Sequence, residues 1–309
     1  MSKIPKITVI ITSLNSAKTI QRTFDSLRKQ KYKNLECIVL DGNSTDGTID
    51  IIKKNEDIIN IFIREENGGA TKAQNKGIEL SSGDLIGYLH SDDYYEENML
   101  SEISNAYIKN HKYDIFSYGI EIERLHDGKV LMSSCSKKNL KLKLNNILFK
   151  HAMGHFYKKS LFENYGNLRT ESIFGDDLYV NDREHLIRLC LLNKKNYVVE
   201  KILYRMSAHK NSNTLSRKNI LAIRYQHIEI AENFMSVYKD SYYKYNKLAD
   251  FKAHNISLLF AYYMLTLSSN KIIETFKSGY NFRGIRWFFD VFYCPISELV
   301  YRASVKKWL

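Results

Sequence analysis

The first ninety residues alternate short apolar runs with segments of helical periodicity. The runs at residues 6–14, 35–41, 58–65 and 84–90 are rich in Ile, Val and Leu, and helix-length segments separate them. Continuous apolar runs are typical of strands buried on both faces, and helix-length connections favour parallel neighbours with right-handed crossovers. The pattern therefore predicts an α/β fold with a doubly wound, mostly parallel central sheet flanked by helices.

After this region the regularity loosens. Residues 113–134 contain two strand-like runs, and residues 151–166 and 181–207 together indicate strand, helix, helix and strand. From about residue 216 the pattern becomes mostly helical. We therefore predict one domain over residues 1–215 and a helical, basic and aromatic extension over residues 216–309.

Composition changes this picture little. The 309 residues are 44% hydrophobic and 26% charged, which is typical of a globular protein. The first residues lead directly into a β-branched run without the pattern of a secretory signal, and no stretch has the 18 to 20 apolar residues of a membrane span. The four cysteines have neither CxxC nor zinc spacing, which suits a reducing compartment. We expect a cytoplasmic protein without disulfides.

The charge is concentrated towards the end of the chain. From Arg217 onward 14 lysine and arginine residues face 7 acidic ones, so this last third carries +7 of the net +12. The basic residues alternate with Tyr, Phe, Trp and Leu. Such a surface could lie against anionic lipid, pack in a homodimer, or be an ordinary solvated helical subdomain.

Polar residues occur where each predicted strand of the first third ends. In strand order they are Thr12 with Ser13, Asp41, Arg64, and Asp92 with Asp93. Each alone is compatible with a turn or a helix cap. Ligands of open parallel sheets bind outside the carboxyl ends of the strands, so the succession predicts one crevice lined by these residues.

The kind of ligand is narrowed by missing motifs. The chain has neither a GxGxxG dinucleotide fingerprint after the first strand nor a GxxxxGK[ST] phosphate loop. Asp92 and Asp93 would repel a bare diphosphate, but carboxylates can hold a Mg²⁺ or Mn²⁺ ion that bridges to one. Neighbouring side chains of an extended segment point to opposite sides, so one carboxylate would face the metal and the other, for example, a ribose hydroxyl.

Three segments in order carry a family resemblance. "ITVIITSLNSAKTIQRTFDSLRKQKYKNLECIVLDGNSTDGT", "ENGGATKAQNKG" and "SSGDLIGYLHSDD" resemble successive blocks of the family 2 glycosyltransferases that build bacterial surface glycans on a GT-A fold. The resemblance is strong over residues 6–96, traceable to about 216 and absent beyond. It implies transfer of a hexosyl or N-acetylhexosaminyl group from a nucleotide-sugar, first of all a UDP-sugar.

The resemblance also implies roles for the strand-end residues. Asp41 matches the acidic residue that contacts the base, and Thr12 lines that pocket. Asp92 would contact the ribose, and Asp93 would bind the Mn²⁺ or Mg²⁺ ion on the diphosphate. Leu14 stands where a tyrosine commonly stacks on the base, so base recognition is expected to be built differently.

The block before the fourth strand departs from the family at one position. Asn67, Gly69, Ala73 and Asn75 match it, whereas Gln74 stands where an arginine is common. The resemblance therefore makes Lys72 and Arg64 the candidates for further contacts to the diphosphate.

A later acidic residue is expected to activate the acceptor. Asp182 in "YVNDREHLIRL" matches the family's acidic block, although Arg183 and Glu184 depart from its usual pattern, and Asp176 and Asp177 are competitors. Such a carboxylate takes the acceptor proton as the hydroxyl attacks the anomeric carbon, which inverts the configuration. The alternative is a carboxylate that only stabilises a helix N-terminus.

Two histidines are further candidates. His151 matches a histidine near the acceptor pocket of related enzymes, and its i, i+4 spacing to His155 is a weak metal signal. His209 lies where the family often has a loop over the donor, and it would supply a third metal ligand or a phosphate contact. Otherwise it is an ordinary loop histidine.

These assignments predict a nucleotide-sugar donor and a glycan or lipid-linked glycan acceptor, with the extension as a peripheral membrane contact. The enzymatic alternative is transfer to a polyprenyl phosphate, which needs no base. The non-enzymatic alternative is a basic binding protein for nucleic acid. The acidic crevice and the lack of a nucleic-acid motif argue against that alternative, so we expect no nucleic-acid partner.

Overall fold

The computed structural model describes residues 4–66, 68–135, 142–149, 153–172, 179–209, 217–265 and 268–283. The chain divides into two compact units. The first, here called the sheet unit, comprises Met1–Thr170 and His185–Ser207, and the second, the helical unit, comprises Glu171–Glu184 and Ala208–Leu309. The sequence pattern did not indicate that residues 171–184 belong with the helical unit.

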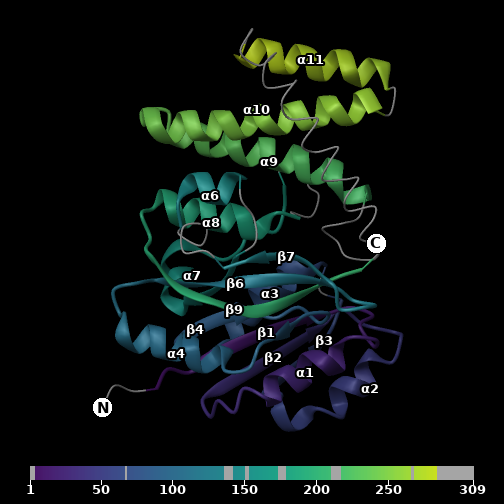
Figure 1. The fold of residues 1–309 in the computed structure, drawn as a ribbon, viewed down its shortest axis with the longest axis vertical. Coiled ribbons are helices and arrows are strands. Elements are labelled where there is room, and N and C mark those ends of the chain that lie inside the picture. Colours follow the sequence, from purple (N-terminus) through teal and green to yellow (C-terminus); the bar gives the residue numbers. More distant parts are fainter. Residues whose placement is uncertain are drawn as a thin grey trace. The chain divides into compact units, whose positions relative to one another are not determined.

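The sheet unit contains one mixed sheet with the strand order β3-β2-β1-β4-β8-β6-β9-β5, and β7 pairs with β6 (Figure 1). The strands are β1 Ile7–Ser13, β2 Leu35–Asp41, β3 Ile61–Arg64, β4 Leu85–Tyr88, β5 Tyr94–Tyr95, β6 Ile115–Arg124, β7 Val130–Ser134, β8 Met153–Lys158 and β9 Asn196–Ala208. The first four are parallel, whereas β8 runs antiparallel to β4 and β6. The predicted α/β fold is confirmed, and antiparallel strands extend its parallel half.

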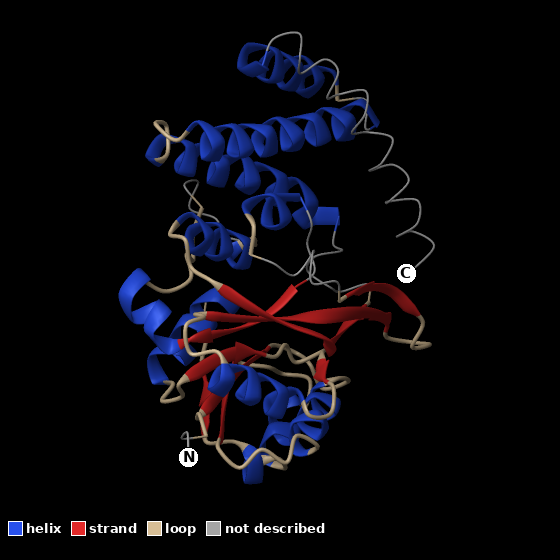
Figure 2. Cartoon of the chain, turned by 60° about the vertical axis from the view of Figure 1, so that its left-hand side comes forward, coloured by secondary structure: helices blue, strands red, loops and turns tan. Residues whose placement is uncertain are grey.

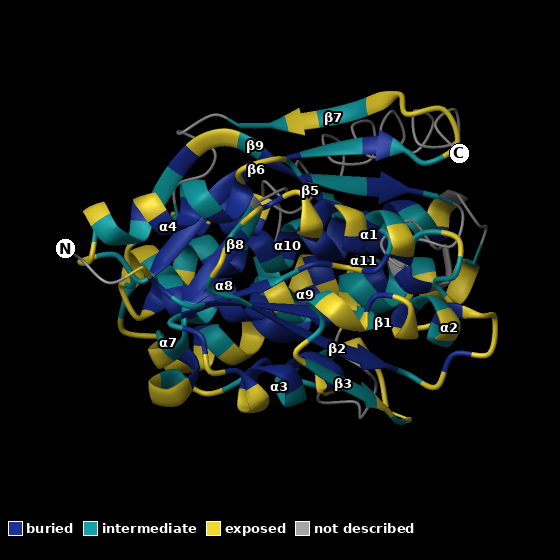
Figure 3. Cartoon of the chain, turned by 90° about the horizontal axis from the view of Figure 1, so that it is seen from below, coloured by how far each residue is buried: buried dark blue, intermediate teal, exposed yellow. Residues whose placement is uncertain are grey.

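Helices cover both faces of the parallel strands. They are α1 Ile20–Arg28, α2 Thr48–Lys53, α3 Ala70–Leu80 and α4 Met99–Lys109, with a short 3₁₀ helix at Glu56–Ile58. Phe24 of α1 packs in one apolar cluster with Val9 of β1 and Val39 of β2, all fully buried. Alternate side chains face α3, where Gly77 lies against Ile10. Figure 3 shows these strands as a buried layer between partly exposed helices.

One glycine fixes the approach of β8 to β4. A Cβ atom on Gly87 would lie 2.2 Å from the ring of Phe156, which is fully buried on β8. Only glycine leaves room for that ring. The close packing places the end of β4, and the acidic residues that follow it, at a defined position in the sheet.

The remaining helices of the sheet unit follow the antiparallel half. They are α6 Leu144–Phe149 and α7 Lys159–Tyr165, while α8 Asn181–Leu191 begins within the helical unit. The helical unit contains α9 Arg217–Val237, α10 Tyr242–Leu265 and α11 Ser269–Arg283, and α10 packs against both other helices. Figure 2 shows these three helices in blue, and the described residues from 217 to 283 contain no strand.

The helices after residue 216 confirm the predicted change to helical structure. Within the described ranges no helix combines the length and the apolar character that a membrane crossing requires. Residues 284–309, which include most of the basic aromatic segment, lie outside the described residues.

Candidate functional site

The carboxyl ends of β1 and β2 are tied together by Asp41. Ser13 and Asp41 are register partners, and the Ser13 hydroxyl donates to the Asp41 carboxylate at 2.5 Å. The backbone N–H and the hydroxyl of Ser44 also donate to it, each at 2.7 Å, and Asp41 is fully buried. Its carboxylate therefore holds the loop after β2 in shape. Thr12, one residue before Ser13, is half-buried at the same edge.

Two predicted basic residues lie around the β3–α3 connection. Arg64 ends β3 as the register partner of Asp41, and its guanidinium donates to the carbonyl oxygen of Ser44 at 3.4 Å. Gly68 and Gly69, with φ of +61° and +108°, precede α3, and Lys72 is exposed in its first turn. Arg64 thus contacts the loop that Asp41 shapes.

The two carboxylates after β4 occupy different surroundings. Asp93 is only 3% exposed, and its two oxygens accept hydrogen bonds from the hydroxyl of Tyr204 at 2.6 Å and the N–H of Ser207 at 2.7 Å. Burial, together with the neighbouring charge of Asp92, raises the pKa of Asp93 to about 7. Asp92 is half-buried. The site therefore contains one buried carboxylate and, next to it, one that reaches the surface.

The carboxylates of Asp92 and Asp93, here called the acidic pair, suit a divalent cation whose other coordination positions are filled by a diphosphate and water. Within the described part of the chain, no group of three or more His, Cys, Asp and Glu side chains is placed to hold a metal. Mg²⁺ and Mn²⁺ bound to a diphosphate need only one or two protein carboxylates, because phosphate oxygens and water fill the other positions. A cation would also relieve the repulsion that raises the pKa of Asp93.

Sequence reasoning missed the residues of α1 and β9 that hold the acidic pair. Tyr204 and Ser207 of β9 contact Asp93, and the guanidinium of Arg22 on α1 donates to the backbone of Asp92. Arg22 lies 70 positions from Asp92, and Tyr204 lies 111 positions from Asp93. No local pattern reports contacts of that range, which depend on the pairing of β5 with β9 and on the packing of α1.

The helical unit contains the other two predicted residues. Asp182 is exposed in the first turn of α8, where its carboxylate accepts the N–H of Arg183 at 2.7 Å. Burial lowers the pKa of Arg183 to about 10, with the Asp182 charge acting against that shift and Arg224 adding to it. His209 is half-buried at the end of a described segment. The competitors Asp176 and Asp177, like Asn67 and His151, lie outside the described residues.

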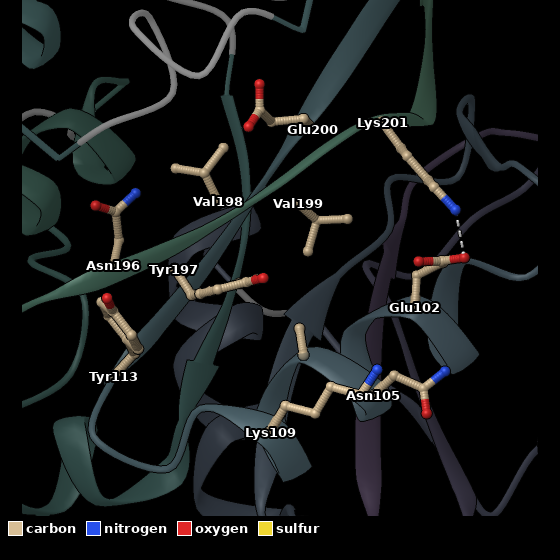
Figure 4. Close-up of a pocket in the computed structure, with 11 residues that line it drawn as sticks. Glu102, Asn105, Lys109, Tyr113, Asn196, Tyr197, Val198, Val199, Glu200 and Lys201 are labelled. Carbon is tan, nitrogen blue, oxygen red and sulfur yellow. Dashed lines mark hydrogen bonds and ion pairs between the residues drawn. The ribbon is translucent and has the colours of Figure 1, made fainter.

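Two cavities of the sheet unit are both lined by Glu102 and Lys201. The first, of about 560 Å³, lies between α4 and β9, where Lys201 donates to Glu102 at 2.6 Å (Figure 4). The second, of about 860 Å³, shares those two residues and extends to Arg22 and Tyr94. None of the predicted donor-site residues lines either cavity. The second cavity is nevertheless lined by Arg22, which contacts the backbone of Asp92.

Comparisons with known proteins identify the family of the chain. Residues 8–166 match the model of the family described as glycosyl transferase family 2. The chain is 27% identical over 214 residues to glycosyltransferase GlyA of Streptococcus pneumoniae, with 62% of this chain and 30% of GlyA covered. It is 26% identical over 266 residues to the GalNAc(5)-diNAcBac-PP-undecaprenol beta-1,3-glucosyltransferase of Campylobacter jejuni, with 81% and 83% covered.

Solved structures support the fold. The chain is similar to S. aureus TarS 1-349 in complex with UDP-GlcNAc, with a TM-score of 0.56, 18% identity, and 89% and 90% of the two chains covered. It is also similar to the mannosyltransferase PcManGT of Pyrobaculum calidifontis in complex with GDP-Man and Mn²⁺, with a TM-score of 0.57, 15% identity, and 94% and 88% covered.

The family match settles the class of enzyme. Because the matched residues make up about half of the chain, the protein belongs to glycosyl transferase family 2, and it is a glycosyltransferase. The resemblance first noted in residues 6–96 is thereby confirmed. The non-enzymatic alternative is wrong, since the match identifies an enzyme family.

Proposed function

We propose that the protein is a metal-dependent, inverting glycosyltransferase that moves a sugar from a UDP-sugar to a hydroxyl of a growing bacterial surface glycan. The observation that carries this proposal is the acidic pair at the end of β4, where the buried carboxylate of Asp93 adjoins the more exposed carboxylate of Asp92. The names of the relatives support the acceptor class, because one acts on an undecaprenol-linked glycan. TarS in complex with UDP-GlcNAc supports the choice of UDP.

The donor would lie across the carboxyl ends of the parallel strands. Asp41 holds the loop after β2, so that loop and Thr12 would form the pocket for the base. Arg64 and Lys72, both exposed at this side of the sheet, would supply positive charge to the diphosphate. A Mn²⁺ or Mg²⁺ ion would neutralise the charge that develops on the departing diphosphate.

The difference in burial favours roles for Asp92 and Asp93 that differ from those the resemblance implies. Both oxygens of Asp93 already accept hydrogen bonds from β9, whereas Asp92 is more exposed. We therefore assign direct contact with the cation to Asp92. Asp93 would keep the segment between β4 and β5 in place and add negative charge behind the cation. If Asp93 is instead the direct ligand, its replacement by Asn will abolish metal binding more completely than replacement of Asp92.

The acceptor step requires one base. Asp182 would accept the proton of the acceptor hydroxyl while that oxygen bonds to the anomeric carbon and the bond from that carbon to the diphosphate oxygen breaks. The products are the extended glycan with inverted configuration and UDP. The exposed position of Asp182 in the first turn of α8 leaves its carboxylate accessible to an acceptor. His209 stays a candidate for a third metal ligand or a phosphate contact.

The test is a donor panel with a base variant. The protein is incubated with Mn²⁺, individual UDP-sugars and a lipid-linked glycan extract, and released UDP is measured. One UDP-sugar should support release in wild type, and Asp182→Asn should reduce it by about 10² to 10⁴-fold without weakening UDP binding. Full activity of Asp182→Asn on a polyprenyl phosphate would instead identify that acceptor. Release from no UDP-sugar, combined with release from another nucleotide-sugar, would contradict the donor assignment.

Peripheral membrane attachment is a separate part of the proposal. The segment after Gly284 contains basic residues interleaved with aromatics, which is the composition of an interfacial anchor. We propose that it keeps the enzyme at the inner face of the membrane near a lipid-linked acceptor. Removal of residues 284–309 should abolish co-sedimentation with anionic vesicles. Unchanged co-sedimentation, or release accompanied by loss of a dimer in gel filtration, would contradict a lipid anchor.

A further inference from the structure

We propose that Arg22 is a positioning residue that holds the acidic pair in the geometry needed for cation and diphosphate binding. The inference rests on the proposed function, because it concerns the same donor site. The Nη2 atom of Arg22 donates to the carbonyl oxygen of Asp92 at 3.1 Å and to the hydroxyl of Ser207 at 2.5 Å. That hydroxyl donates to the same carbonyl at 2.6 Å. One main-chain oxygen is thus held from both α1 and β9.

The other side of the Arg22 guanidinium is equally constrained. Its Nη1 atom donates to Glu123 of β6 at 3.1 Å, and Glu123 is only 8% exposed. The hydroxyl of Tyr94 donates to the second oxygen of Glu123 at 2.9 Å. The guanidinium carbon also lies 4.5 Å from the centre of the Tyr94 ring. The planar, multidentate guanidinium can satisfy these contacts together, which the single ammonium of a lysine cannot do.

The residue next to Arg22 holds the second member of the pair. The hydroxyl of Thr23 donates to the carbonyl oxygen of Asp93 at 2.8 Å. Consecutive residues of α1 therefore fix consecutive carbonyl oxygens of the acidic pair. With both carbonyls fixed, the backbone torsions that aim the Asp92 side chain have little freedom. Supporting contacts of this kind usually change metal affinity by about 10 to 100-fold.

Arg22 is accessible as well as constrained. Its side chain is 38% exposed, and it lines the cavity of about 860 Å³ beside β5. A residue needed only for the core would be more deeply buried, as Phe24 is two positions along the same helix. The contacts of Arg22 converge on the acidic pair and on Glu123, which ties α1, β6 and β9 to one short segment.

Arg28 offers a matched control on the same helix. Its guanidinium donates to Asn55 at 2.5 Å and to Asp57 at 2.6 Å, and no contact with the acidic pair is found for it within the described residues. Replacement of either arginine by alanine removes one cation and one set of hydrogen bonds from α1. Only Arg22→Ala should affect the segment between β4 and β5.

The first readout needs no ligand. In Arg22→Ala, amide hydrogen exchange of a peptide covering residues 90–95 should increase about tenfold, while Arg28→Ala should leave it within about twofold of wild type. The second readout is calorimetric titration of UDP with Mn²⁺. Its Kd should rise by about 10 to 100-fold in Arg22→Ala and stay unchanged in Arg28→Ala. Arg22→Lys should recover thermal stability but not the affinity for UDP with Mn²⁺.

The outcomes separate this inference from the proposed function. Unchanged exchange in Arg22→Ala would overturn the positioning role, and so would increased exchange with unchanged affinity for UDP and Mn²⁺. Full recovery of affinity in Arg22→Lys would also overturn it, because charge alone would then suffice. A wild-type protein that binds no nucleoside diphosphate with Mn²⁺ would overturn the donor assignment itself, and the positioning role with it.

Discussion

Buried carboxylates at the amino ends of the parallel strands (the amino edge) and at their carboxyl ends (the carboxyl edge) have pKa values shifted in opposite directions. At the amino edge, Glu36 is 5% exposed and accepts hydrogen bonds from Lys6 at 2.7 Å, Thr8 at 2.6 Å and the N–H of Ser82 at 2.8 Å. Burial raises the pKa of Glu36, but the hydrogen bonds from Lys6, Ser82 and Thr8 outweigh it and lower the pKa to about 2. At the carboxyl edge, burial and a like charge raise the pKa of Asp93 to about 7.

This difference in pKa is the one expected between a carboxylate that stabilises the fold and a carboxylate at a ligand site. The charge of Glu36 is balanced by a lysine of the same fold, so the folded state prefers the ionised form. Burial and the adjacent carboxylate of Asp92 oppose the ionisation of Asp93, and the proposed cation would reduce this opposition. Strained electrostatics of the second kind are common at functional sites.

The largest expected effect is on catalysis. Asp92→Asn removes the carboxylate that we assign to the cation, so the diphosphate would leave without that stabilisation. Turnover should fall by about 10³-fold or more, which corresponds to about 4 kcal/mol or more. The measurement is UDP release at saturating donor. A fall below tenfold would show that Asp92 does not bind the cation.

The next effect is a pH dependence of stability. Because the pKa of Asp93 rises from 3.8 to about 7 on folding, the folded state keeps a proton that the unfolded state has lost. Without metal, the free energy of unfolding contributed by this group should therefore fall between about pH 4 and about pH 7, by up to about 4 kcal/mol. Urea unfolding at several pH values measures this fall. Asp93→Asn should flatten it, and an unchanged slope would contradict the raised pKa.

At the amino edge we expect the free energy of unfolding to change with pH in the opposite direction. The depressed pKa of Glu36 contributes stability that is present above about pH 4.5 and is lost as the pH falls towards about 2. Glu36→Gln should therefore lower the free energy of unfolding by about 2–3 kcal/mol at pH 7 and by little near pH 2. Activity per folded molecule should not change. Glu102→Gln, which breaks a more exposed pair with Lys201, should cost less than about 1 kcal/mol.

The smallest effect concerns one hydroxyl. Tyr204→Phe removes a donor to Asp93 and should destabilise the protein by about 1 kcal/mol. It should also raise the pKa of Asp93 in the folded state, because that hydrogen bond favours the ionised form. The loss of stability with rising pH should therefore extend to higher pH. Tyr95→Phe removes a buried hydroxyl that donates to the Tyr88 carbonyl instead. Tyr95→Phe should lower the free energy of unfolding by as much, without changing how stability depends on pH. Equal pH profiles of stability for Tyr95→Phe and Tyr204→Phe would contradict the role of Tyr204.

The same contrast explains how far the sequence could predict the structure. The runs that form β1 to β4 were identifiable because buried parallel strands are continuously apolar, and Asp92 with Asp93 followed directly from the end of one run. The contacts that give the two carboxylates different surroundings were not identifiable. They come from Arg22, Tyr204 and Ser207, which reach the pair only through the pairing of β5 with β9 and the packing of α1.

Asp41 illustrates the same limit. Its place at the end of β2 identified it as a residue of the strand-end crevice, but its full burial and its hydrogen bond from Ser13 depend on the register of β1 with β2. The roles proposed for Asp182 and His209 belong to the helical unit, where sequence periodicity predicts helices without defining a site.

The central claim is that the acidic pair binds a diphosphate through a divalent cation. Calorimetric titration of UDP into the wild-type protein, with Mn²⁺ and again with a chelator, tests it most directly. We predict binding with Mn²⁺ that weakens by about tenfold or more when the metal is removed, because two carboxylates repel a bare diphosphate. Equal UDP affinity with and without metal would contradict the claim.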